Sequence, residues 1–396
     1  MRTNQSISYT PEGAVSVSYT ALLSAPGSLN EAIERAFGSS PECLGIIVVR
    51  DLPPTYAAYR QRLLTLAYKF AKLDENVREQ YTDASSSYSF GWSHGKEIMN
   101  GKPGIPKVFE AVSFCCDSHS TDVLKGSYYA NPVIDSPSAS ISAQHRTEWP
   151  EYYAQNIWPK PDEKGVEGFE EAFKDLGRFV LDVGCALAAA CQPFGTSIFW
   201  TDFATSHLTR WLPALSHFSD TSMSLPKLIS TSQTTKARLL HYFPPSQNNP
   251  LPAENEPVDS WCGFHLDHSL LTGLTSAMYL SEGDGKFLEP TVVQSPSESS
   301  GLYIRTRGGD LTKVSIPEDS LAFQTGEALE IATGGKLRAT PHCVRVGSGV
   351  ANSNKISRET FALFMQPDTD QSLSPSVTFG QFSRGVFVEH YEKISD

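Results

Sequence analysis

Apolar positions predict helices and one early strand in the first half of the chain. Residues 44–49 form a β-branched run that two prolines follow at 53 and 54, which predicts a buried strand with a sharp stop. Residues 55–81 carry leucines, alanines and an aromatic at helical spacing. Residues 166–193 place seven apolar side chains on one face and predict the longest helix, which we expect Pro193 and Gly195 to end.

From residue 236 onward the pattern changes to short strands separated by turn residues. Residues 1–20 alternate weakly and predict one further strand, while 82–165 are rich in Ser, Gly, Pro and aromatic residues and predict ordered loops over a pocket. The predicted C-terminal strands are 237–242, 275–280, 301–305, 320–325 and 359–365, with hairpin turns at 282–285 and 308–310. Many short strands with frequent turns predict a sandwich or jelly roll.

Composition supports a globular protein and argues against nucleic acid as a partner. The 396 residues are 40% hydrophobic, enough for a large core, and the net charge is −12. No long run of Lys and Arg is present, and nucleic-acid affinity depends on cationic contacts to phosphates. No apolar run reaches about 18 residues, so no membrane span is expected.

Cysteine usage and the N-terminal segment predict a cytoplasmic protein. Residues 1–19 are polar and lack the apolar core of a signal peptide. The seven cysteines are odd in number, scattered, and form no CxxC pair. We therefore expect reduced thiols, with Cys343 a small packing residue.

Two separated segments offer a set of metal ligands. In a strand, residues two apart face the same side, so His265 and Asp267 can point together into the mouth of a barrel. His342 follows far along the chain, after a Thr-Pro pair. Two imidazoles and one carboxylate that leave open coordination positions are the ligand set of non-haem iron(II) oxygenases. An HxD pair alone is a weak signal, because a satisfied strand histidine is its commoner explanation.

A third segment adds a candidate anion site. Arg358 and Thr360 lie two apart and lead into an apolar strand. A buried guanidinium needs an anionic partner, and its planar shape suits a carboxylate. A dicarboxylate such as 2-oxoglutarate would satisfy this arginine with one end and chelate iron with the other.

Together these segments resemble the 2-oxoglutarate and iron(II)-dependent dioxygenases of the isopenicillin N synthase-like family. The similarity is strongest over 236–367 and also touches the strand at 44–49 and the tail at 378–391. The stretches that carry it are residues 237–245 (Ala-Arg-Leu-Leu-His-Tyr-Phe-Pro-Pro), His265-Leu266-Asp267, residues 326–342 and Arg358-Glu359-Thr360.

The resemblance implies fold, cofactors and reaction. The fold would be α+β or mainly β, a double-stranded β-helix (a distorted jelly roll) with an N-terminal helical buttress. It would form one integrated unit of three regions: 1–165 with helices and pocket loops, 166–235 with the long helix and its connection, and 236–396 as the catalytic part. Fe(II), 2-oxoglutarate and O₂ would oxidise, most simply hydroxylate, a C–H bond of a small molecule, with release of succinate and CO₂. No obligate protein partner is evident. Asp267 argues against a halogenase, which needs that position vacated.

The chain departs from the family pattern at several points. Phe243 stands where the family often has a tyrosine before proline, so Tyr242, one residue earlier, is the candidate to contact the co-substrate. Cys343 replaces a usual arginine, and the segments 281–319 and 347–354 are extended. None of these changes removes a ligand.

Aromatic and histidine side chains supply candidates for the substrate pocket. Core packing is the commoner role for each aromatic. The candidates are Phe90, Trp92, His94, Phe109, Phe264, Tyr279 and Phe364, with His268 as a neighbour of the ligands. The remaining histidines without a motif, expected to be structural or exposed, are His119, His145, His207 and His217.

Two alternatives stay open. One is an iron oxidase of the same fold that does not consume 2-oxoglutarate, in which Arg358 and Thr360 would hold a carboxylate of the substrate. The other is a jelly roll that binds a ligand without turnover. The intact ligand set favours an enzyme over the second alternative.

Overall fold

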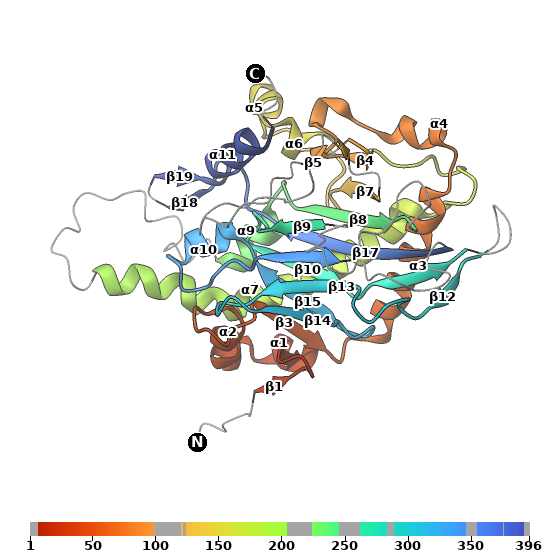
Figure 1. Cartoon of the computed structure of the whole chain (residues 1–396). Coiled ribbons are helices and arrows are strands. Elements are labelled where there is room, and N and C mark those ends of the chain that lie inside the picture. Colours follow the sequence, from red (N-terminus) through yellow and green to blue (C-terminus); the bar gives the residue numbers. More distant parts are fainter. Residues whose placement is uncertain are drawn as a thin grey trace.

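Two β-sheets organise the protein, and helices cover one face of the larger sheet (Figure 1). The computed structural model describes residues 7–96, 98–99, 120–121, 124–203, 224–244, 262–282, 289–345, 355–374 and 376–391. The large mixed sheet has 11 strands, with the order β1-β2-β3-β15-β10-β17-β8-β7-β4, with β11 paired to β17 and with β12 paired to β11. The small sheet has the order β14-β13-β16-β9.

The strands have the following bounds. In the large sheet they are β1 Ser8–Tyr9, β2 Val15–Ser18, β3 Ile46–Arg50, β4 Gly91–His94, β7 Lys125–Ala130, β8 Lys236–Tyr242, β10 Leu271–Thr275, β11 Met278–Ser281, β12 Thr291–Val293, β15 Leu321–Thr325 and β17 Ile356–Met365. In the small sheet they are β9 Cys262–His265, β13 Gly301–Arg305, β14 Leu311–Val314 and β16 His342–Arg345. Two further two-stranded sheets pair β5 Ile98–Met99 with β6 Ser120–Thr121 and β18 Ser372–Ser374 with β19 Val377–Thr378.

The helices lie mostly in the first half of the chain. They are α1 Tyr19–Ser24, α2 Asn30–Phe37, α3 Pro54–Ala71, α4 Glu75–Arg78, α5 Ala143–Glu148, α6 Pro150–Tyr153, α7 Phe169–Phe203, α9 Leu225–Thr231, α10 Glu327–Ala332 and α11 Phe379–Tyr391. Short 3-10 turns add Pro26–Leu29, Glu79–Tyr81 and Ala84–Ser86.

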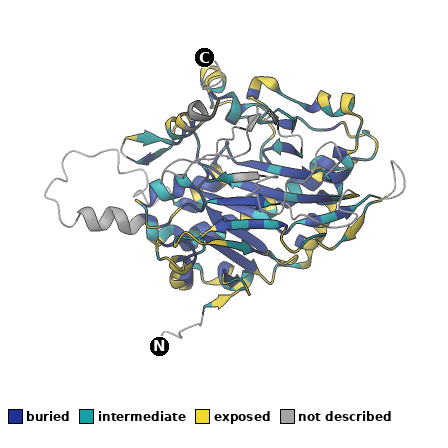
Figure 2. Ribbon diagram, viewed as in Figure 1, coloured by how far each residue is buried: buried dark blue, intermediate teal, exposed yellow. Residues whose placement is uncertain are grey.

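One face of the large sheet is buried against α3 and α7. Successive side chains of a strand point to opposite faces, so Phe361 and Leu363 of β17 point to the helices and pack in one core with Phe173 of α7. Gly273 of β10 allows the close approach, because a Cβ there would lie 2.5 Å from Val180 Cγ1 of α7. The sheet and its covering helices form the most buried part of the molecule (Figure 2).

The other face of the large sheet looks toward the small sheet. Ile46 and Val48 of β3 and Tyr242 of β8 pack there in a second apolar cluster with Ile304 of β13. The β17 strand therefore carries two sets of side chains. Those at 357, 359, 361 and 363 serve the helical side, and those at 358, 360, 362 and 364 face the space between the sheets.

The prediction of one continuous strand at 275–280 is wrong. The chain forms β10 and β11 with a break at Ser276 and Ala277, because β10 pairs with both β15 and β17 whereas β11 pairs with β12 and the far end of β17. Arg60 of α3, itself 5% exposed, fixes this break by donating hydrogen bonds to the carbonyls of Ser276 at 3.0 Å and Ala277 at 2.8 Å.

The predicted end of the long helix at Pro193 and Gly195 is also wrong, because α7 continues to Phe203. Proline removes one backbone donor from a helix but does not forbid its continuation when the preceding turns are held by packing. Gly195 does not take the left-handed conformation that typically ends a helix.

The other predicted strands and the helix at 55–81 are confirmed with small shifts of their ends. The early strand is β3, the helix at 55–81 is α3 followed by α4 and a 3-10 turn, and the turn at 308–310 joins β13 to β14. The N-terminal 20 residues form two short strands instead of one. The turn at 282–285 lies largely outside the described residues. Within the described parts of the chain, no helix is long and apolar enough to cross a membrane.

A buried pair of polar residues joins β8 to β17 on the helical side. His241 and Glu359 lie directly opposite each other and are 1% and 0% exposed. His241 Nδ1 donates to Glu359 Oε1 at 2.9 Å, and the Ser357 hydroxyl donates to the same oxygen at 2.7 Å. The adjacent pair in the same register, Tyr242 and Arg358, points to the opposite face of the sheet, into the space between the sheets.

We predict that Glu359→Ala lowers the free energy of unfolding by about 3 kcal/mol, because removing one member of a buried pair leaves the other without its partner. Chemical denaturation measures the change. Glu42→Ala, which breaks an exposed ion pair with Arg35, is the control and leaves the unfolding midpoint almost unchanged. Equal effects of the two variants would contradict a structural role for the buried pair.

Candidate metal centre

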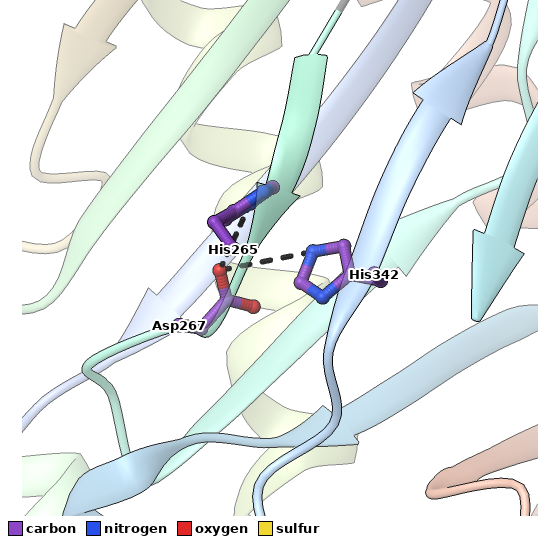
Figure 3. Close-up of side chains that lie close together, drawn as sticks. All are labelled: His265, Asp267 and His342. Atoms are coloured by element: carbon purple, nitrogen blue, oxygen red, sulfur yellow. Dashed lines mark ion pairs between the residues drawn. The ribbon is translucent and has the colours of Figure 1, made fainter. Parts of the chain in front are cut away.

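Three side chains, two from neighbouring strands and one from the segment after β9, converge at one end of the small sheet (Figure 3). His265 is the last residue of β9 and pairs with His342, the first residue of β16. Asp267 follows β9 by two residues. The Asp267 Oδ1 atom lies 3.7 Å from His265 Nε2 and 3.9 Å from His342 Nε2, and the imidazole centroids are 4.2 Å apart. One nitrogen or oxygen atom of each residue lies within 4.8 Å of the other two.

The orientation of His342 is set by its own strand. Its Nδ1 atom donates a hydrogen bond to the Thr340 carbonyl at 2.9 Å, which leaves Nε2 as the basic nitrogen that faces Asp267. Burial, and next the charge on His265, lower the pKa of His342 to about 4. The side chain is therefore neutral at pH 7, as a metal ligand must be.

Asp267 is a buried carboxylate whose second oxygen lacks a hydrogen-bond partner. Burial alone would raise its pKa, but the nearby imidazoles of His342 and His265 and a hydrogen bond from Thr272 outweigh burial and lower the pKa. The Oδ2 atom has no protein partner among the described residues. A buried anion with an unsatisfied oxygen beside two imidazoles is the arrangement that a cation would stabilise.

The residues present fit a divalent metal ion. Two imidazole nitrogens and a carboxylate oxygen on one side form the facial triad of non-haem iron(II) sites, and they leave the opposite side open to other ligands. His265 is the most accessible of the three, with 31% of its side chain exposed against 5% for Asp267 and 7% for His342. The site thus opens on the His265 side.

A cavity of about 540 Å³ extends from these three residues between the two sheets. Its walls include Tyr242 of β8 and Arg358 and Thr360 of β17. The register of β17 with β8 places Arg358 opposite Tyr242, and the guanidinium carbon lies 4.9 Å from the centroid of the Tyr242 ring. Every residue that the sequence predicted for metal and co-substrate therefore borders this one cavity.

The family resemblance suggests a tyrosine at position 243, but this chain has Phe243, and the structure shows where Tyr242 and Phe243 each lie. Tyr242 lines the cavity and is 2% exposed. Phe243 lies beyond the end of β8, with its ring 4.4 Å from that of His241 and 4.7 Å from that of His94. The tyrosine hydroxyl is thus retained in the chain one residue earlier than the family pattern places it.

The candidate pocket aromatics divide into two groups. Tyr279 and Phe364 line the cavity, as predicted. Trp92 and His94 do not line it, because Trp92 packs on Phe70 at 5.2 Å and His94 on Phe243. Phe90 instead lies under the ammonium of Lys236, and Phe264 lies under the guanidinium of Arg305.

The remaining histidines have structural partners or lie outside the described residues. His268 hydrogen-bonds Glu327 at 2.9 Å, and His145 hydrogen-bonds the Thr369 hydroxyl at 2.7 Å. Cys343 is fully buried, as expected of a packing residue. Phe109, His119, His207 and His217 lie outside the described residues.

The sequence did not single out two threonines that support the ligands. The Thr272 hydroxyl, which hydrogen-bonds that of Ser269 at 2.8 Å, lowers the pKa of Asp267, and the Thr340 carbonyl accepts a hydrogen bond from His342. Thr340 precedes His342 by two residues and was visible in the motif. Thr272 was not, because it belongs to no motif and lies near Asp267 through the start of β10.

Comparison with solved structures identifies the fold. A 2OG-Fe(II) oxygenase family protein from Caulobacter crescentus has a TM-score of 0.57 and 17% identity over 95% of this chain and 99% of its own. An oxygenase from Shewanella oneidensis has a TM-score of 0.56 and 15% identity over 95% and 98% of the two chains. A full-length Neurospora crassa protein, crystallised in complex with α-ketoglutarate, has a TM-score of 0.54 and 14% identity over 92% and 89%. The chain thus has the fold of 2OG-Fe(II) oxygenases, and the resemblance predicted from the sequence is confirmed at the level of fold.

Sequence comparison adds one short match. A UPF0676 protein of Schizosaccharomyces pombe is 35% identical over 82 residues, which are 20% of this chain and 24% of that protein. The match therefore spans about a quarter of the length of the yeast protein. No family model matches the chain.

We predict that Asp267→Ala and His342→Ala each weaken Mn(II) binding by more than about 100-fold, because loss of a ligand exceeds the 10- to 100-fold effect of losing an outer partner. Isothermal titration calorimetry measures the affinity. His268→Ala is the matched control: it removes a neighbouring imidazole that bonds Glu327, and it retains wild-type affinity. Wild-type affinity in Asp267→Ala would remove that carboxylate from the metal site.

Proposed function

We propose that this protein is a non-haem Fe(II)/2-oxoglutarate-dependent dioxygenase that oxidises a C–H bond of a small molecule, most simply by hydroxylation. One observation carries the proposal: the two imidazoles, the carboxylate and the buried guanidinium of Arg358 all border one cavity between the sheets. The fold shared with 2OG-Fe(II) oxygenases supports it.

In this function His265, Asp267 and His342 hold the metal and Arg358 holds the co-substrate. The bound iron would supply the activation of O₂ and the oxidative decarboxylation of 2-oxoglutarate to succinate and CO₂. Arg358 would receive the carboxylate remote from the metal in a charge-assisted hydrogen bond, with Thr360 as a second donor. The Tyr242 ring packs against the Arg358 guanidinium and would orient that guanidinium. The Tyr242 hydroxyl would lie at the same end of the cavity.

The fold supports one integrated catalytic unit. We propose that the two facing sheets are the double-stranded β-helix and that α3 and α7 act as its helical buttress. The division into 1–165, 166–235 and 236–396 describes regions of that unit, because β2, β3, β4 and β7 of the first region join the same sheet as β8, β10, β15 and β17. A cytoplasmic location and the absence of an obligate protein partner stay predictions.

An iron oxidase of the same fold is the second candidate. Arg358 and Thr360 would then hold a carboxylate of the substrate. The buried, inward-facing position of Arg358 is compatible with both functions, but the two differ in the products of turnover.

We predict that oxygen consumption by the iron-loaded protein requires 2-oxoglutarate and forms one succinate per O₂. Oxygen electrode and succinate assays on the same sample measure the ratio. Oxygen uptake without succinate would favour the oxidase. A protein that binds neither iron nor 2-oxoglutarate would be a non-catalytic jelly roll.

Arg358→Ala should raise the KM for 2-oxoglutarate by about 10- to 100-fold, because a hydrogen bond to a charged group contributes about 1.5–3 kcal/mol. Mn(II) affinity should stay unchanged, since the metal ligands are intact. Arg384→Ala, which removes an exposed arginine paired with Glu148, serves as the control. Wild-type KM in Arg358→Ala would refute the role of this guanidinium.

A further inference from the structure

The face of the large sheet that looks into the cavity is strongly cationic. Among the described strands of both sheets, Glu359 is the only acidic residue, and it lies on the opposite face with His241. The inward positions of β7, β8 and β17 instead carry Lys125, Lys236, Arg238 and Arg358. This concentration of positive charge contrasts with the net charge of −12 of the chain.

Two of these four cations line the cavity, and they lie at different depths. Arg358 is opposite Tyr242, whereas Arg238 is opposite Ala362, four residues further along β17. At about 3.3 Å per residue, the two positions lie roughly 13 Å apart along the strand. A small dicarboxylate that chelates the metal with one end and pairs with Arg358 at the other has no third anionic group to bind Arg238.

Arg238 lies toward the metal end of the cavity. Phe364 and Thr272 form the next inward-facing pair beyond Ala362 and Leu274 in the β17–β10 register, and Thr272 lies five residues from Asp267 in the chain and lines the same cavity. Arg238 is therefore closer along the strand to the proposed reaction centre than Arg358 is.

The position of the Arg238 guanidinium is held by the neighbouring strand. Its Nε atom donates to the Ser127 hydroxyl at 2.9 Å, and its central carbon lies 5.1 Å from the centroid of the Tyr129 ring. Both residues belong to β7 and face the same side of the sheet as Arg238. A guanidinium fixed in this way is preorganised to bind a planar or tetrahedral anion.

The other charged groups among the described residues near this face have their own places and contacts. Asp267 belongs to the metal centre, while Glu298, Lys313 and Glu318 come from the β12–β15 segment at the rim, where Lys313 bonds the Glu298 carbonyl. Lys236 is directed to the Glu151 carbonyl and the rings of Phe90 and Tyr152. Lys125, 5% exposed, pairs with Tyr242 and adds positive charge to the same face.

We propose that the primary substrate is an anion and that Arg238 binds its carboxylate or phosphate group. This inference rests on the proposed function, because it assigns Arg358 to 2-oxoglutarate and Arg238, which lines the same cavity, to the molecule that is oxidised. Arg238 thereby fixes the distance between the anionic group and the reacting C–H bond, and Ser127 and Tyr129 act as positioning residues.

The test uses small anions as probes of the loaded protein. Protein saturated with Mn(II) and 2-oxoglutarate is titrated in a calorimeter with acetate and, separately, with inorganic phosphate. We expect wild-type protein to bind one of them, and the tighter one identifies the anionic group. Arg238→Gln should weaken that binding at least tenfold, and Arg238→Lys should retain part of it. Arg35→Gln, which removes an exposed arginine of α2 that is not among the residues lining the cavity, should bind as wild type does.

The controls separate this inference from the proposed function. Mn(II) and 2-oxoglutarate affinities are measured first in every variant, together with the thermal unfolding midpoint. Failure of wild-type protein to bind 2-oxoglutarate would refute the proposed function itself. With 2-oxoglutarate bound normally, equal anion affinity in wild type and Arg238→Gln, or no anion binding by wild type, overturns the role of Arg238. An anion that coordinates the metal instead would bind Arg238→Gln as tightly as wild type.

Discussion

The buried carboxylate of Asp267 beside two imidazoles is the interaction on which the site depends. A carboxylate that is 5% exposed, with one oxygen lacking a partner among the described residues, is costly unless a positive charge stabilises it. His342 does not supply that charge, because burial and the neighbouring imidazole lower its pKa to about 4. The three side chains alone are thus electrostatically incomplete, and a divalent cation would complete them.

The alternation of side chains along β17 connects this centre to the rest of the fold. Inward positions carry Arg358 and Thr360, and the adjacent outward positions carry Glu359 and Phe361, which pack under the helices. A slip of one residue between β8 and β17 would bury the guanidinium among the helices and move Glu359 into the cavity. The hydrogen-bonded pair of His241 and Glu359 is specific to the observed register, so the stability of the helical side and the chemistry of the cavity side depend on the same pairing.

The cluster of candidate metal ligands could be predicted from the sequence because their chemistry is unusual and their spacing is local. The HxD pair and the R-x-T pair each lie within one short segment, and the third ligand follows a distinctive Thr-Pro pair. The break at Ser276 could not be predicted, since it depends on Arg60, which lies more than 200 residues earlier in the chain. The orientation of Trp92 and His94 away from the cavity also required the pairing of β4 with β7. Arg238 did not stand out in the sequence for the same reason: its place in the cavity depends on the pairing of β8 with β7 and β17, which are distant along the chain.

We propose that His265, Asp267 and His342 hold one ferrous ion and that 2-oxoglutarate chelates this ion. Anaerobic titration of Fe(II) into the protein in the presence of 2-oxoglutarate, followed by visible absorption, tests it most directly, because a 2-oxoacid chelated to ferrous iron gives a charge-transfer band. We expect a band that saturates at one iron per chain and is absent without 2-oxoglutarate. Tight binding of iron with no such band, or no binding of iron at all, would contradict the claim.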